Sequence, residues 1–198
     1  MLFQPTYFSP IYQFQQLVNA DEVVFEVQDN FQKQTYRTRL KIYTPNGVQT
    51  LVIPIKHNKG VRQKTKDVRI DHSFRWQRKH FKSLQNSYRS SPYFEFYEED
   101  IAPIYDKQYE FLLDFLFETQ EMCFEMLQIE GNYTKTSSYE PEYGNEKDFR
   151  FLANAKSDKN FDVLAYKQVF EIKHGFKPNL SILDLLFNEG PNAISFLM

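Results

Sequence analysis

Hydrophobic and polar residues alternate along the chain in patterns that predict strands and helices in turn. The apolar pair Leu2–Phe3 is typical of a short strand, which Pro5 ends. From Ile11 to Ala20 apolar residues recur every three or four positions, and this spacing predicts a helix. The β-branched and aromatic run Glu22–Val27 predicts a second strand. Because short connections join these elements, we expect a βαβ unit with two parallel strands and a right-handed crossover.

A β-hairpin is predicted next. Two β-rich runs, Leu40–Tyr43 and Gln49–Ile53, flank a turn that contains Asn46-Gly47. An Asn-Gly pair between two such runs is the strongest short hairpin signal, because both residues tolerate a positive φ angle. The basic, glycine-bearing segment Lys56–Lys66 that follows is expected to be a loop.

The rest of the chain is predicted to be largely helical, with weaker strand signals. Helices are predicted for Phe74–Tyr88, Tyr93–Tyr97, Tyr109–Ile129 and Ser181–Phe187, and strands for Asp67–Ile70, Tyr133–Thr136 and Phe161–Phe170. The helix Tyr109–Ile129 is apolar on more than one side, so it should be central or lie at an interface. Asp184 lies among leucines of the last helix and needs a buried partner, such as an arginine, unless it faces solvent. The sequence thus predicts a single α/β domain over residues 1–198, with a mainly parallel sheet, an inserted hairpin and a long buried helix.

Composition narrows the class of protein. Of the 198 residues, 41% are hydrophobic and 25% are charged, which is ordinary for a globular domain. The single cysteine, Cys123, permits no internal disulfide and no cysteine–histidine zinc spacing, and the helix around it makes it an inert core residue. The amino terminus lacks the basic start and apolar run of a signal peptide, and no apolar stretch approaches the roughly 20 residues of a membrane span. We therefore expect a cytoplasmic protein without a membrane span or a metal site. The scattered glycines form neither a G-x-G-x-x-G motif nor a P-loop.

Charge is distributed unevenly, although the net charge is only −2. Between Lys33 and Arg89 there are 15 basic residues and two acidic ones, whereas residues 90–198 carry 9 basic and 20 acidic residues. A basic surface for a phosphate-bearing partner would explain this asymmetry. Packing of the basic third against the acidic residues, with mutual neutralisation, would explain it equally well.

The segment Asn30–Arg39 is the most informative candidate site. It follows the predicted strand Glu22–Val27, and in open α/β sheets ligands bind beyond the carboxyl ends of the strands. Its candidate binding side chains are those of Asn30, Gln32, Lys33, Tyr36, Arg37 and Arg39. The guanidinium groups are suited to gripping a phosphate or a carboxylate, and the neutral groups add hydrogen bonds. The alternative is a solvated edge strand, on which charges discourage aggregation. If the site binds an anion, alanine at both arginines should abolish binding while the protein stays folded.

Three other positions are weighed against structural roles. Gln4 and Tyr7 lie between the first predicted strand and helix, which is the ligand position of a βα unit, although Tyr7 also suits the core. His80 lies one helical turn after Trp76 and is the candidate for proton transfer, because an unperturbed imidazole titrates near neutral pH. A partly buried histidine at the rim of a helix is the alternative. His57, in the basic loop, is a weaker candidate.

Several segments, in order along the chain, resemble the WbqC-like protein family. They are Gln4-Pro-Thr-Tyr-Phe8, Asn19-Ala-Asp21, Asn30–Arg39, Ile53-Pro54, Trp76 with His80, Ser90-Ser-Pro-Tyr-Phe94 and the closing Gly175–Pro191. The match covers most of the chain, and the Gln-Pro-x-Tyr-Phe start and the Lys/Arg-rich segment are fairly specific together. The resemblance implies a protein associated with bacterial O-antigen gene clusters that transfers glycine or a similar small acyl group onto a sugar. It also implies a Rossmann-like sheet similar to that of nucleotidylyltransferases.

The sequence departs from the family pattern at two places. Ser9-Pro10 stands where the family usually has Pro-Trp, and Asp148–Phe161 lacks the glycines that many members carry there. If those glycines shape a nucleotide site, this chain binds its ligand differently or has lost the chemistry.

The leading hypothesis is therefore a transferase of a small acyl or aminoacyl group onto a nucleotide- or lipid-linked sugar. Its partner would be an anionic small molecule, a nucleotide or a sugar nucleotide, and the sequence names no cofactor. The alternative is a non-catalytic binding module whose basic face docks RNA, a nucleotide or an acidic partner. RNA is the less favoured of these because no RRM-like aromatic motif is present. A homo-oligomer built through the helix Tyr109–Ile129 is a third hypothesis.

Overall fold

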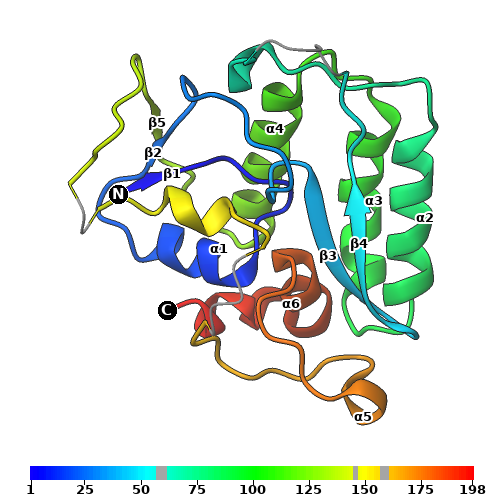
Figure 1. Cartoon of the computed structure of the whole chain (residues 1–198). Helices are drawn as coiled ribbons and strands as arrows, with labels where there is room; N and C mark the ends of the chain where they lie inside the picture. Colours follow the sequence, from blue (N-terminus) through cyan, green and yellow to red (C-terminus); the bar gives the residue numbers. More distant parts are fainter. Residues whose placement is uncertain (57–61, 145–146, 157–160) are drawn as a thin grey trace.

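Short strands and longer helices alternate through a computed structural model that describes residues 1–56, 62–144, 147–156 and 161–198 (Figure 1). The elements in chain order are β1 (Leu2–Phe3), α1 (Ile11–Val18), β2 (Val24–Phe25), β3 (Arg39–Thr44), β4 (Gly47–Val52), η1 (Thr65–Asp67), α2 (Trp76–Tyr88), α3 (Phe94–Asp106), α4 (Leu112–Met126), β5 (Thr134–Lys135), η2 (Arg150–Ala153), α5 (Glu171–His174), α6 (Ile182–Glu189) and η3 (Gly190–Phe196), where η marks a 3₁₀ helix. His57 lies outside the described residues.

A three-stranded parallel sheet contains the amino terminus of the chain. Strand β2 lies between β1 and β5, with Leu2 opposite Val24 and Val24 opposite Thr134. Helix α1 connects β1 to β2, so the predicted βαβ unit is confirmed, as is a strand within the predicted segment Tyr133–Thr136. All three strands run in the same direction, and their carboxyl ends therefore meet at one edge of the sheet.

Strands β3 and β4 form the predicted antiparallel hairpin. Their register runs from Arg39 opposite Val52 to Thr44 opposite Gly47. The φ angle of Gly47 is +101°, a conformation that residues with a side chain rarely adopt, which explains the glycine at this position. The Thr44 hydroxyl donates to the Gly47 carbonyl and accepts from the backbone N–H of Asn46, so the turn satisfies its own polar groups.

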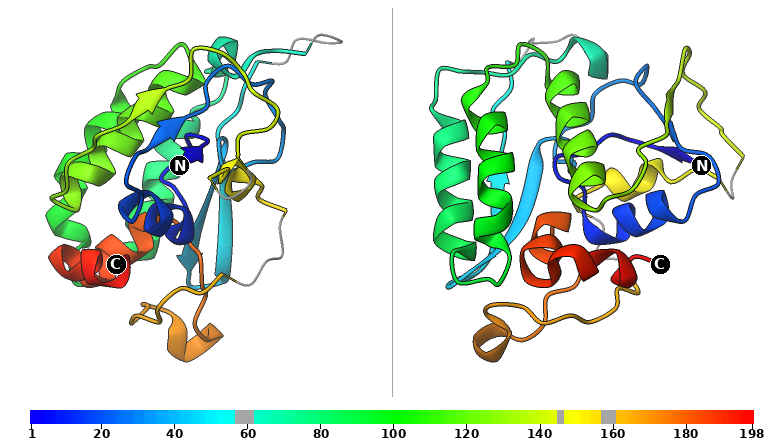
Figure 2. Two further views of the ribbon diagram at one scale, coloured as in Figure 1. Left: turned by 90° about the vertical axis from the view of Figure 1, so that its left-hand side faces the viewer. Right: turned by 180° about the vertical axis from the view of Figure 1, so that it is seen from behind.

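Helices α2, α3 and α4 form a layer behind the hairpin, and Figure 2 shows the three side by side in its view from behind. Helix α4 is the predicted long helix, and both its Phe115–Phe117 segment and its Cys123 are buried. Burial raises the pKa of the Cys123 thiol, which keeps it protonated and supports the reading of an inert core residue. The predicted central position of this helix is thus confirmed.

Helix α3 is longer than predicted. The sequence predicted only Tyr93–Tyr97, whereas the helix continues to Asp106 and contains Pro103. The run Glu98–Asp100 lies mostly at the surface, while Ile101 and Ile104 are buried. The helix is therefore amphipathic, and its packing against α2 and α4 outweighs the cost of an internal proline.

Two predicted strands are wrong. Asp67–Ile70 instead makes isolated contacts, in which the backbone N–H of Leu112 donates to the Val68 carbonyl and that of Ile70 donates to the Glu110 carbonyl. Phe161–Phe170 is described throughout and contains no strand. In both segments the β-type residues pack against neighbouring elements without a continuous ladder, which local composition does not reveal.

The fold is a mixed α/β arrangement of helices with one small parallel sheet and one hairpin. Each parallel strand is two residues long, whereas each hairpin strand has six. The prediction of parallel strands is therefore confirmed for the short three-stranded sheet, whereas a Rossmann-like sheet stays a prediction.

Asp184 on α6 is fully buried, but its partners differ from the expected arginine. Its two carboxylate oxygens accept hydrogen bonds from the hydroxyls of Tyr88, at 2.7 Å, and Tyr166, at 2.5 Å. The side-chain amide of Gln168 donates to it as well, at 3.1 Å. Burial raises the pKa of Asp184 to about 6, and the three hydrogen bonds oppose this shift. Ser181 caps α6, because its hydroxyl accepts from the N–H of Leu183.

The substitution Asp184→Asn should change how stability depends on pH. In the folded protein the pKa of Asp184 is about 6, whereas an aspartate in an unfolded chain titrates at about 4. Between these values the folded state holds a proton that the unfolded state has lost. The carboxyl group therefore lowers the free energy of unfolding as the pH rises through this window, by about 3 kcal/mol in total.

Urea unfolding of both proteins at a series of pH values checks this. The free energy of unfolding of the variant, relative to that of the wild type, should rise by about 3 kcal/mol between about pH 4 and pH 7. Other titrating groups are common to both proteins and cancel from this difference. A difference that stays constant over that range would contradict the assignment.

Candidate functional site

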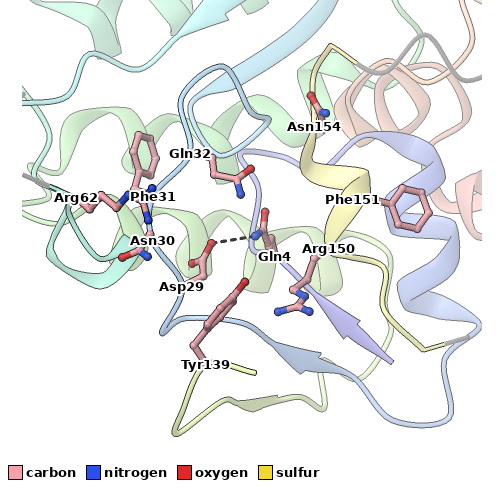
Figure 3. A pocket seen from close by; sticks show the side chains of 10 residues that line it. All are labelled: Gln4, Asp29, Asn30, Phe31, Gln32, Arg62, Tyr139, Arg150, Phe151 and Asn154. Carbon is pink, nitrogen blue, oxygen red and sulfur yellow. Dashed lines mark hydrogen bonds between the residues drawn. The ribbon is translucent and has the colours of Figure 1, made fainter. Parts of the chain in front are cut away.

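A cavity of about 610 Å³ opens at the carboxyl edge of the parallel sheet (Figure 3). Gln4 follows β1 directly, Asp29 and Asn30 come shortly after β2, and Tyr139 comes shortly after β5. Each parallel strand thus contributes to the lining, at the position where ligands bind in open α/β sheets. The other lining residues are Phe31, Gln32, Arg62, Arg150, Phe151 and Asn154.

A buried ion pair between Asp29 and Arg37 forms the base of this region. Arg37 is 0% exposed and Asp29 is 3% exposed. The Nη2 atom of Arg37 donates to Oδ2 of Asp29 at 2.7 Å, and Nη1 donates to Oδ1 at 3.3 Å. The hydroxyl of Thr65 donates to the same carboxylate at 2.6 Å, and the side-chain amide of Gln4 does so at 3.0 Å. Four donated hydrogen bonds therefore occupy the two oxygens of Asp29.

The charges of this pair neutralise each other inside the protein. Burial lowers the pKa of Arg37 from its ordinary value, while the nearby carboxylates of Asp29 and Glu26 oppose that change. Removing one member of a buried ion pair of this kind leaves an uncompensated buried charge. The Nε atom of Arg37 has no hydrogen-bond partner among the described residues. Its terminal nitrogens are bonded to the protein, and its guanidinium does not line the cavity.

A second arginine, Arg150, joins the loop after β5 to η2. Its Nε atom donates to Oδ1 of Asp148 at 2.9 Å, and its terminal nitrogens donate to the backbone carbonyls of Glu140, at 2.8 Å, and Pro141, at 3.1 Å. Its hydrogen bonds with Asp148 raise the pKa of Arg150 above its ordinary value. Because its donors are taken up by the protein, Arg150 shapes the wall of the cavity and keeps the loop in place.

Neutral amides, aromatic rings and one further cation form the accessible part of the lining. The amide side chains of Asn30, Gln32 and Asn154 are exposed, and they offer both donors and acceptors. Figure 3 shows Gln32 and Tyr139 pointing toward the centre of the cavity, where Gln4 and Asp29 also lie. Arg62 has no ion-pair partner in the part of the chain that the structure describes. Such a surface suits a polar ligand with hydroxyl groups and a negative charge.

The structure places the residues of the predicted segment Asn30–Arg39 in different surroundings. Asn30 and Gln32 line the cavity, whereas Lys33 is exposed without lining it. Tyr36 is 7% exposed and packs under the ammonium group of Lys41, at 5.5 Å from the ring centre. Arg39, partly buried, begins β3. The ligand-binding roles of Lys33, Tyr36, Arg37 and Arg39 stay predictions.

Tyr7 and His80 belong to a buried network away from this cavity. The hydroxyl of Tyr7 lies 3.1 Å from Nδ1 of His80 and 2.7 Å from the hydroxyl of Tyr105. Burial lowers the pKa of His80 to about 4, and its hydrogen bond to the backbone carbonyl of Val52 opposes the shift. At neutral pH the imidazole is therefore uncharged and bonded within the protein. Its predicted role in proton transfer stays a prediction.

The comparison with known families identifies the chain. The sequence profile of the WbqC-like protein family matches residues 4–159 and 142–196, which together cover nearly the whole length. The chain belongs to the WbqC-like protein family. It is also 26% identical over 213 residues to an uncharacterized protein of Mycobacterium tuberculosis, Rv1507c, in a match that covers 93% of this chain and 90% of that protein. No solved structure matches the chain.

Sequence reasoning on this WbqC-like chain missed five residues that line the cavity, besides the acid beside the predicted segment. Asp29 immediately precedes that segment, and its position after a strand was the signal that could have found it. Arg62 lies in the predicted basic loop. Tyr139, Arg150, Phe151 and Asn154 come from a polar stretch with no local pattern, and only the fold brings them to the cavity.

Two further findings on this WbqC-like protein concern the described residues alone. Within them, no helix is both long enough and apolar enough to cross a membrane. No group of three or more His, Cys, Asp or Glu side chains there is arranged to hold a metal ion.

The substitution Arg37→Ala should destabilise the folded protein rather than merely weaken ligand binding. It leaves the carboxylate of Asp29 buried without its counter-charge, which costs about 3–5 kcal/mol of the free energy of unfolding. Chemical denaturation measures this loss. The exposed neighbour Lys33 provides a control, since Lys33→Ala should change stability by no more than about 0.5 kcal/mol. Equal, small losses for both variants would show that the buried pair is not essential to the fold.

Proposed function

We propose that the cavity binds a sugar nucleotide, and that the protein transfers a small acyl or aminoacyl group onto the sugar of that ligand. The supporting observation is the position of the cavity, at the carboxyl ends of β1, β2 and β5. A volume of about 610 Å³ suits a ligand of this size. The proposal takes up what the resemblance implied, glycyl-like transfer to a sugar, whereas the family match establishes membership alone.

The lining offers a partner for each part of such a ligand. Asn30, Gln32 and Asn154 can hydrogen-bond to sugar hydroxyls, because each amide both donates and accepts. The rings of Phe31 and Tyr139 provide apolar faces for a base or a sugar ring. Arg62 supplies the positive charge that a diphosphate requires. The anion-binding role that was predicted for Arg37 passes in this proposal to Arg62.

The chemistry of the cavity favours an amine over a hydroxyl as the acceptor. In the transfer, the acceptor atom attacks the acyl carbonyl carbon, the leaving group departs with its electron pair, and the acceptor loses a proton. A hydroxyl needs a base to remove that proton during the attack, but both oxygens of Asp29 are already occupied by donors. An uncharged amine attacks without prior deprotonation and releases its proton to solvent afterwards. We therefore favour an amino sugar, with an amide as the product.

The second candidate is a binding module without catalysis. The occupied carboxylate of Asp29 favours this candidate as well, since among the described lining residues no carboxylate or imidazole is free to act as a base. Such a module would bind the sugar nucleotide in the same cavity and leave it unchanged.

Ligand binding should raise the thermal stability of the protein. A sugar nucleotide at a concentration well above its Kd stabilises the folded state by mass action, whereas the free sugar lacks the anion for Arg62. The variants Asn30→Ala and Gln32→Ala should each weaken binding by about fivefold, the effect of one hydrogen bond. Gln108→Ala, an exposed amide away from the cavity, is the matched control. If no sugar nucleotide shifts the melting temperature, or if the control weakens binding as much as the variants, the assignment of the cavity is wrong.

Catalysis is tested separately from binding. The protein is incubated with a nucleotide-linked amino sugar and a panel of activated donors, namely acyl thioesters and aminoacyl adenylates. Mass spectrometry should then show a sugar nucleotide heavier by the acyl group, and the gain should disappear when the amine is acetylated beforehand. Binding without any gain in mass across the panel would favour the binding module over the transferase.

A further inference from the structure

A second groove, of about 720 Å³, lies between β4 and α2 and is separate from the cavity at the sheet edge. One side is formed by residues 49–52 of β4, and the other by the flank of α2. The lining contains Arg75, Arg78, Lys79 and Lys82, and no acidic residue of the described chain takes part in it. These four cations belong to the basic third of the sequence, and the proposed function does not use them.

The four cations form an unneutralised row along one side of α2. Arg75 is the N-cap of α2, and positions 75, 78, 79 and 82 follow the spacing i, i+3, i+4 and i+7, which places their side chains on one face of the helix. Among the described residues none of the four has an ion-pair partner; the ion pairs there use other cations. The neighbouring acid Glu98, for example, pairs with Arg89. The row is therefore available to negative charge from outside.

The opposite side of the groove is an unpaired strand edge. The N–H of Ile53 donates to the carbonyl of Thr38, which continues the ladder between β3 and β4. Because bonded positions alternate in an antiparallel pair, the backbone groups of Val48, Thr50 and Val52 point away from β3. The carbonyl of Val52 lies near the imidazole of His80, whose pKa it raises against the effect of burial. No hydrogen bond among the described residues uses the N–H and C=O groups of Val48 and Thr50, so these groups can pair with another strand.

We propose that this groove binds an extended acidic peptide segment of a partner protein, which adds to β4 as a third strand of the hairpin sheet. The backbone of the segment pairs with Val48 and Thr50, and its carboxylates bind the cation row of α2. This mode combines main-chain hydrogen bonds with side-chain specificity, as in other cases of strand addition.

The geometry also gives the side-chain pattern of the partner. Residues directly opposite each other in a sheet point to the same face. Leu51 is buried and lines the groove together with the flank of α2, so partner residues opposite Gln49 and Leu51 point toward α2 and should be acidic. Val48 and Val52 are 45% and 50% exposed on the outer face, so partner residues opposite them should be apolar. The expected segment alternates acidic and apolar residues.

A nucleic acid fits these observations less well. Its phosphates would bind the cation row, but a phosphate backbone has no regular series of donors and acceptors to match the strand edge. Its binding would also be governed mainly by counterion release, without dependence on the backbone of β4. Whether binding depends on the backbone of β4 therefore distinguishes a peptide partner from a nucleic acid.

The experiment uses a fluorescein-labelled heptapeptide of alternating glutamate and valine, with binding followed by fluorescence anisotropy. Thr50→Pro removes an outward N–H and no ladder bond, a position at which an edge strand tolerates proline. It should weaken peptide binding by at least tenfold, while Thr50→Val, which keeps the N–H, should not. Arg78→Ala with Lys82→Ala should also weaken binding about tenfold, and Lys33→Ala with Lys66→Ala is the control of equal charge.

Two further probes decide between main-chain pairing and charge alone. A heptapeptide N-methylated at alternate residues keeps its charges but cannot pair with β4, so it should bind at least tenfold more weakly. Because this probe leaves the protein unchanged, it tests main-chain pairing even if Thr50→Pro fails to fold. An oligouridylate of equal charge should bind more weakly than the peptide. The proposal is overturned if N-methylation leaves affinity unchanged, if Thr50→Pro folds and binds the peptide normally, or if the oligouridylate binds more tightly than the peptide.

Discussion

The buried ion pair between Asp29 and Arg37 is the contact on which the arrangement of the site depends. It joins the segment after β2 to the residues that lead into the hairpin, while Gln4 and Thr65 bond to the same carboxylate from β1 and η1. Four parts of the chain therefore meet at two oxygen atoms. Removing two charges from water is costly, and the cost is offset only when the donors around the carboxylate are all in place. The base of the cavity is consequently held by groups from four separate parts of the chain.

The basic residues that cluster in the sequence have several different roles in the fold. Arg37 is used internally, and Arg69 and Arg89 pair at the surface with the acids Glu110 and Glu98. Neutralisation by the acidic part is thus confirmed for some residues of the basic third, whereas the basic surface for a phosphate-bearing partner stays a prediction. Among the described residues the cations of α2 are not neutralised in this way, and they are remote from the cavity. A charge count finds an excess of positive residues, but the fold decides which of them meet a partner.

The predictable features of this WbqC-like protein are those that neighbouring residues determine. The hairpin, the βαβ unit and the buried α4 follow from periodicity and turn chemistry within short windows. The cavity's location at a carboxyl edge followed from the βαβ unit, and Gln4, Asn30 and Gln32 were found in this way. The burial of Arg37 was not predictable, because an arginine in a polar stretch reads as exposed until its partner is known. Arg150 and Asn154 were missed because tertiary contacts alone bring them to β1 and β2.

The segment that departs from the family pattern has a consequence for how ligands are recognised. In Asp148–Phe161 the sequence lacks the glycines that the family resemblance led us to expect. This segment contributes η2 and the lining residues Arg150 and Asn154. A glycine-rich wall would present backbone N–H groups to a phosphate at close range, since no side chain intervenes. Here the wall presents side chains, and Arg150 is already bonded to Asp148 and to the loop after β5. Recognition in this chain should therefore rest on amide and aromatic side chains, which favours discrimination among sugars and bases over tight capture of phosphate.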